Sequence, residues 1–146
     1  MNILFVDDQP VLKVEHAINH LKTKGIEFSL VVEKSVNSAI RYINTHKNEI
    51  DLAFVDLGLP IFNNGEGYAP LEGLYVIDFI YRKNPKVPII INSSTVIPDE
   101  EAYLNDRFPE ATIVHVHNLD FEWFEDYVKK LSWMYRLQRK TWSFIL

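Results

Sequence analysis

The chain has 146 residues, of which 47% are hydrophobic and 13% aromatic, and its formal net charge is −5. This length and composition suit a single globular domain with a continuous core. The negative charge argues against a broad nucleic-acid surface, and the apolar stretches are too short for a membrane helix. The absence of cysteine excludes a disulfide framework and a thiolate metal site. The first residues read as a strand and not as a secretion signal, so we expect a soluble, cytoplasmic protein.

Five short apolar segments alternate with five segments of helical periodicity. Strands are expected at residues 2–6, 28–32, 50–55, 87–91 and 112–116, and helices at residues 11–24, 35–43, 71–81, 99–108 and 120–137. Ser35 and Asp120 are expected to cap the second and the last helix. Apolar strands joined by crossover helices predict a doubly wound α/β fold around a parallel sheet.

Two segments depart from this regular alternation. The loop at residues 61–70 contains glycine and asparagine and is longer than the usual strand-to-helix connection, so we expect it to border a functional site. The last helix has an apolar arc wider than one core contact requires. Two interpretations of this arc stay open. Its extra aromatic residues pack on residues 141–146 of the same chain, or they form a homodimer or partner interface.

Three aspartates follow predicted strands. Asp7 and Asp8 end the first strand, and Asp56 ends the third. Ligands of open parallel α/β sheets bind at the carboxyl ends of the strands, near the point where the strand order reverses. If the first and third strands are neighbours, the three carboxylates converge and repel one another unless a cation such as Mg²⁺ neutralises them. The alternative is that these aspartates cap turns.

These segments resemble the receiver domain of two-component response regulators. Residues 2–10, NILFVDDQP, are similar to the opening strand and acidic pair of that family, and residues 51–60, DLAFVDLGLP, to its phosphoacceptor strand. Gly73-Leu74 before a helix and the segment PIIINSS at residues 88–94 also fit. The resemblance covers residues 1–131 and leaves residues 132–146 as a C-terminal helix extension and tail.

The resemblance implies a five-stranded sheet of order 2-1-3-4-5 and a set of site residues. Mg²⁺ would be held by Asp7, Asp8, Asp56 and the backbone carbonyl of Gly58. Asp56 would accept a phosphoryl group from a phosphohistidine on a sensor histidine kinase or phosphotransfer protein, forming an acyl phosphate that water later hydrolyses. Ser93 would donate a hydrogen bond to a phosphoryl oxygen; its alternative role is to cap the following turn.

The end of the fifth strand departs from the family pattern. His117 stands where the family has a lysine, Asn118 where it has a proline, and Val114 where it has a switch aromatic. A histidine has a shorter reach than a lysine, and its charge depends on pH. We therefore expect His117 either to replace the lysine as a catalytic cation or to have a structural role only.

Histidine pairs suggest further metal sites. His115 shares a strand face with His117, and two histidines beside three aspartates are compatible with a transition-metal site. His16 and His20, four residues apart on the first helix, are more readily explained as a solvated face.

Three functions remain open. The first is a stand-alone receiver, a phosphorylatable Mg²⁺-dependent switch that is not a conventional enzyme and signals through protein contacts. The segment after residue 131 is too short for a DNA-binding effector domain, and we expect no nucleic-acid or membrane partner. The loss of the lysine favours the second, a pseudo-receiver that acts without phosphorylation. The third is a metal-dependent phosphoester hydrolase that uses the loop at residues 61–70 as a wall and the two histidines as acid and base.

Overall fold

The computed structural model describes residues 1–9, 12–117 and 121–145. Strands and helices alternate along this part of the chain, as the sequence predicted. The elements are β1 (Asn2–Val6), α1 (Leu12–Thr23), β2 (Ser29–Glu33), α2 (Val36–His46), β3 (Leu52–Val55), α3 (Gly73–Lys83), β4 (Ile89–Asn92), α4 (Glu100–Arg107), β5 (Ile113–Val116) and α5 (Phe121–Ile145). The expected cap Asp120 and the predicted proline replacement Asn118 lie outside the described residues.

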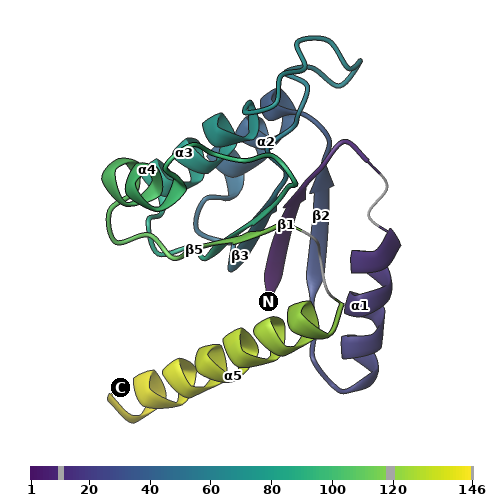
Figure 1. Cartoon of the computed structure of the whole chain (residues 1–146). Helices are drawn as coiled ribbons and strands as arrows, with labels where there is room; N and C mark the ends of the chain where they lie inside the picture. The colour runs from purple at the N-terminus through teal and green to yellow at the C-terminus, as the bar shows by residue number, and fades with distance from the viewer. Residues whose placement is uncertain (10–11, 118–120, 146) are drawn as a thin grey trace. The chain divides into compact units, whose positions relative to one another are not determined.

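The five strands form one parallel sheet in the order β2-β1-β3-β4-β5 (Figure 1). This order confirms the fold class and the predicted adjacency of the first and third strands. Val6 is paired with Val55, so β1 and β3 end at the same level of the sheet. The residues that follow them, Asp7 and Asp56, therefore leave the sheet side by side.

The sheet core explains why the strands are apolar along their whole length. Side chains of β1 and β3 alternate between two faces, and both sets are buried. On one face the strands pack against α2 and α3, which lie side by side in Figure 1; this cluster includes Leu4, Val6, Ala39, Ile43, Ala53, Val55, Val76 and Ile77. On the other face Phe5 stacks on Phe54 with ring centroids 4.3 Å apart.

The chain divides into two compact units. Residues 1–10 and 29–118 form the sheet unit, and residues 11–28 and 119–146 form a helical unit that contains α1 and α5. Within the helical unit, Nε2 of His20 lies 3.8 Å from a carboxylate oxygen of Glu125. Helix α5 continues through residues 141–145, so this segment lengthens the helix. None of the described helices combines the length and apolar character needed to cross a membrane.

The loop between β3 and α3 is tied to the start of α2. The N–H groups of Val36 and Asn37 donate to the carbonyls of Pro60 and Ile61, each at 3.0 Å. Ser35 caps α2 as predicted, because its Oγ accepts from the N–H of Ser38 at 3.2 Å. These bonds hold the loop at the carboxyl edge of the sheet, where β3 ends.

Helix α3 begins in direct contact with the backbone that follows β3. The N–H of Gly73 donates to the carbonyl of Leu57 at 2.8 Å. A Cβ atom at residue 73 would lie 2.1 Å from the carbonyl oxygen of Asp56, a distance that no side chain tolerates. Glycine at this position therefore allows α3 to fix the backbone around Asp56.

We predict that Gly73→Ala destabilises the protein by about 1–3 kcal/mol, because the added methyl group forces the backbone of α3 away from Asp56. Urea unfolding measures the change. Gly58→Ala is the matched control: its Cβ would meet only the hydroxyl end of Tyr68, a side chain that can move. Equal stability losses in the two variants would contradict the close backbone contact at Gly73.

Candidate functional site

Three carboxylates converge at the carboxyl edge of the sheet. Asp7 and Asp8 follow β1, and Asp56 follows β3, where its N–H donates to the carbonyl of Val6 at 2.9 Å. One oxygen atom from each carboxylate lies within 4.8 Å of the other two. The predicted convergence of these side chains is therefore present in the structure.

Burial and mutual repulsion raise the pKa values of Asp7 and Asp56. The pKa of Asp7 is raised to about 6, mainly by burial. The hydrogen bond from the N–H of Gln9 to Oδ1 of Asp7, at 2.9 Å, lowers this pKa. The negative charges of Asp56 and Asp8 raise it further. The pKa of Asp56 is also raised, first by burial and then by Asp8. Hydrogen bonds from the N–H of Gly58, at 3.1 Å, and from the Ser93 hydroxyl oppose this rise.

The donor set fits a hard divalent cation. Among the described side chains, no lysine, arginine or histidine forms a salt bridge with Asp7, Asp8 or Asp56. Three oxygen ligands of this kind suit Mg²⁺, which binds one or two carboxylates together with water and phosphate oxygens. A cation here would remove the repulsion that raises the two pKa values.

A hollow of about 450 Å³ opens above the carboxylates. Its wall combines the acidic groups with hydroxyl, amide and imidazole side chains. The lining residues are Asp8, Gln9, Asp56, Gly58, Tyr68, Asn92, Ser93, Ser94, Thr95 and His117. This polar, solvent-connected space suits a phosphate-sized group.

Ser93 makes the turn-capping contact that the sequence offered as its alternative role. Its Oγ accepts a hydrogen bond from the N–H of Thr95 at 3.1 Å, as expected of a residue that caps a turn. Its hydroxyl also hydrogen-bonds the Asp56 carboxylate. The N–H of Ser93 donates to the carbonyl of Val116 at 3.2 Å, which holds the residue at the end of β4.

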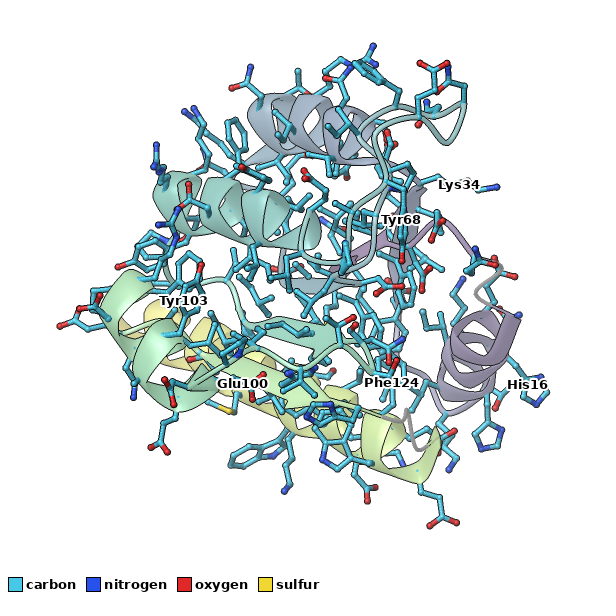
Figure 2. All side chains as sticks on the ribbon, turned by 45° about the horizontal axis from the view of Figure 1, so that its top comes forward. His16, Lys34, Tyr68, Glu100, Tyr103 and Phe124 are labelled. Atoms are coloured by element: carbon cyan, nitrogen blue, oxygen red, sulfur yellow. The ribbon has the colours of Figure 1, made fainter. Side chains whose placement is uncertain are left out.

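Tyr68 is a wall residue that the sequence did not single out. It is labelled in Figure 2 and lies in the loop at residues 61–70, which was expected to border the site. Its hydroxyl end lies against Gly58. The tyrosine is 61% exposed, so its ring is accessible from solvent. The length of the loop predicted that it borders the site. Which of its side chains faces the hollow depends on the path of the loop, which turns at Gly65 and Gly67, both with positive φ.

His115 in β5 and His117 directly after it are arranged differently from the expectation. His117 lines the hollow, whereas His115 contacts Glu100 and the carbonyl of Ser93. Ligand atoms of His115, His117 and Glu100 lie within 4.8 Å of one another, so the histidines group with a glutamate and not with the aspartates. Both ring nitrogens of His115 have partners, which removes it as a free acid or base for the hydrolase hypothesis.

No protein-family model and no curated protein matches the sequence. Solved structures do match in shape. The non-phosphorylated HemR receiver domain from Leptospira biflexa is 18% identical, with 90% of this chain and 93% of that chain covered and a TM-score of 0.64. The receiver domain of the Francisella response regulator 1452 is 16% identical over 90% and 95% of the two chains, with a TM-score of 0.60. NtrX from Brucella abortus is 20% identical over 96% of this chain, with a TM-score of 0.61.

The chain has the fold of a response-regulator receiver domain. It spans 29% of the length of the NtrX chain and nearly the whole of the two isolated receiver domains. At these identities the likeness concerns the fold. The chemistry of the cleft has to be inferred from its own residues.

We predict that Asp7→Asn raises the free energy of unfolding of the metal-free protein at about pH 7.5 by about 2 kcal/mol. The folded state of the wild type binds the Asp7 proton more tightly than the unfolded state, so this contribution to stability is full below about pH 4 and is lost as pH rises through about 6. Asparagine keeps the oxygen that accepts from Gln9 and has no charge to lose. Urea unfolding with a chelator at about pH 5 and pH 7.5 measures the effect.

Asp106→Asn, on the exposed side of α4, is the control and should leave stability unchanged at both pH values. An Asp7→Asn variant with the stability and pH dependence of the wild type would show that Asp7 does not carry the raised pKa.

Proposed function

We propose that this chain is a phosphoacceptor module of a two-component phosphorelay, in which Asp56 receives a phosphoryl group from a sensor histidine kinase or a phosphotransfer protein. Its output would be transmitted through contacts with another protein. The observation that carries the proposal is the cluster of Asp7, Asp8 and Asp56. Among the described side chains, no cationic group forms a salt bridge with these carboxylates, and the Ser93 hydroxyl lies beside Asp56.

The residues of the cleft account for the steps of such a transfer. A carboxylate oxygen of Asp56 attacks phosphorus, the bond from phosphorus to the donor nitrogen breaks, and the electron pair stays on the leaving imidazole. The product is an acyl phosphate, which water hydrolyses later. Mg²⁺ held by Asp7, Asp8, Asp56 and the Gly58 carbonyl would supply the positive charge that offsets the carboxylates and the phosphoryl oxygens.

Ser93 is the described group best placed to bind the transferred phosphoryl. Its hydroxyl already hydrogen-bonds Asp56, so a group attached to that carboxylate would lie within its reach. A donor fixed at the end of a strand needs no reorganisation as charge develops on the phosphoryl oxygens. The Tyr68 side chain would limit access of the donor protein from the loop side.

A pseudo-receiver remains the second candidate, because one observation favours it. His117, in the place of the family lysine, lines the hollow but has Glu100 and His115 as its closest potential co-ligands. A module that signals without phosphorylation would keep the fold and use its surface alone. Retention of three repelling carboxylates argues for the phosphoacceptor, since an interaction module gains nothing from them.

We predict that incubation with Mg²⁺ and acetyl phosphate adds one phosphoryl group to the wild-type protein and none to Asp56→Asn, as read by intact-protein mass. Asparagine removes the nucleophile while keeping the size of the side chain. Asp106→Asn, an exposed aspartate outside the cleft, should be labelled like the wild type.

Each outcome separates the candidate functions. A single adduct that requires Asp56 supports the phosphoacceptor, and labelling that persists in Asp56→Asn contradicts its assignment. Folded protein that takes up no phosphoryl group supports the pseudo-receiver. Multiple turnover of an unrelated phosphoester would support a hydrolase.

We predict that His117→Ala slows labelling about tenfold or more, because a charge-assisted hydrogen bond of this kind contributes about 1.5–3 kcal/mol. His117→Lys should label at least as fast as the wild type, since lysine has a longer reach and a permanent charge. Time courses of labelling measure both. His46→Ala on α2 is the control, and wild-type rates in His117→Ala would assign His117 a structural role.

A further inference from the structure

We propose that Glu100, His115 and His117 form a second metal site, which takes a transition-metal dication of the Zn²⁺ class and is distinct from the acidic cleft. One ligand atom of each residue lies within 4.8 Å of the other two. His115 lies in β5 and His117 follows its last residue, and their ring centroids are 4.0 Å apart. Glu100 begins α4 and is labelled in Figure 2. The proposal does not depend on phosphorylation of Asp56.

The hydrogen bond between Nε2 of His115 and the backbone of Ser93 is the first argument that His115 is a metal ligand. Its Nε2 lies 2.9 Å from the carbonyl oxygen of Ser93. A carbonyl oxygen only accepts hydrogen bonds, so Nε2 carries the hydrogen and Nδ1 is directed at Glu100. Metal-binding histidines almost always make such a contact, because it fixes the tautomer and the ring orientation of the ligating nitrogen.

The contact between Nδ1 of His115 and the Glu100 carboxylate is the second argument. A nitrogen lone pair and a carboxylate oxygen are both acceptors, so this contact requires a shared proton in the metal-free protein. A metal ion can replace the proton, and His117 then supplies the third ligand. Ligands of a tetrahedral Zn²⁺ lie about 3.3 Å apart, so small side-chain movements close the set.

The surroundings hold one ligand firmly and leave the site open to solvent. The side chain of His115 is 4% exposed and that of Glu100 is 31% exposed, whereas His117 is exposed. The first turn of α4 is fixed by a hydrogen bond from the N–H of Tyr103 to the carbonyl of Asp99 at 2.8 Å. A hollow of about 230 Å³ borders Glu100 and His115, which leaves space for water as a fourth ligand.

Ligand chemistry separates the two sites. Two imidazole nitrogens and one carboxylate are typical of zinc and related transition metals. The three carboxylates of the acidic cleft offer only oxygen, which suits Mg²⁺. Excess Mg²⁺ should therefore leave the Glu100 site available to Zn²⁺.

We predict that the full chain binds one Zn²⁺ at this site in the presence of millimolar Mg²⁺, as measured by calorimetric titration, and that Co²⁺ gives the visible absorption of a nitrogen- and oxygen-ligated ion. Glu100→Gln and His117→Gln should each weaken Zn²⁺ binding at least tenfold. Both residues are accessible to solvent, and circular dichroism verifies that the variants are folded.

Two double variants serve as controls. Asp7→Asn with Asp56→Asn removes the acidic cleft, and His16→Gln with His20→Gln removes the spaced pair on α1. Both should bind Zn²⁺ with wild-type affinity. Binding that survives Glu100→Gln and His117→Gln, that is lost in either double variant, or that is absent from the wild type up to about millimolar Zn²⁺ would overturn the proposal and leave Glu100 and His115 as a structural pair.

Discussion

Parallel pairing of β1 and β3 is the constraint on which the site depends. The ladder sets the spacing of the two strands, and their last paired residues, Val6 and Val55, are directly opposed. Asp7 and Asp56 follow at the same level, so their backbones cannot separate without breaking the sheet. A proton or a cation relieves the repulsion between their carboxylates. Burial at this edge is the main cause of the raised pKa values of Asp7 and Asp56, and the repulsion adds to it.

Helix α3 and the end of β4 hold Asp56 in place beside the other two carboxylates. Gly73 brings the start of α3 against the Asp56 backbone, and Ser93 at the end of β4 donates its hydroxyl to the same residue. Both contacts fix the position of Asp56 without neutralising it. The cleft is therefore less favourable to the metal-free folded state than an apolar edge would be.

His117 belongs to two groups of residues, the lining of the acidic hollow and the cluster with Glu100 and His115. It lines the acidic hollow, and its ring nitrogen lies within 4.8 Å of ligand atoms of Glu100 and His115. Imidazole binds transition metals when it is neutral, which an ammonium group cannot do.

The sequence by itself determined the alternation of strands and helices and the parallel sheet, because these follow from local periodicity. It also placed Asp7, Asp8 and Asp56 at the common edge at which parallel strands end. Their convergence required β1 and β3 to be neighbours, an order that the resemblance implied and the tertiary structure shows. Tertiary structure alone decided which side chains meet across elements. Glu100 and His115 are separated by 15 residues and lie on different elements, and no spacing rule relates them. The position of Tyr68 likewise depends on the path of its loop, and the contact at Gly73 on how closely α3 approaches the strand. These are packing distances, which residue patterns do not encode.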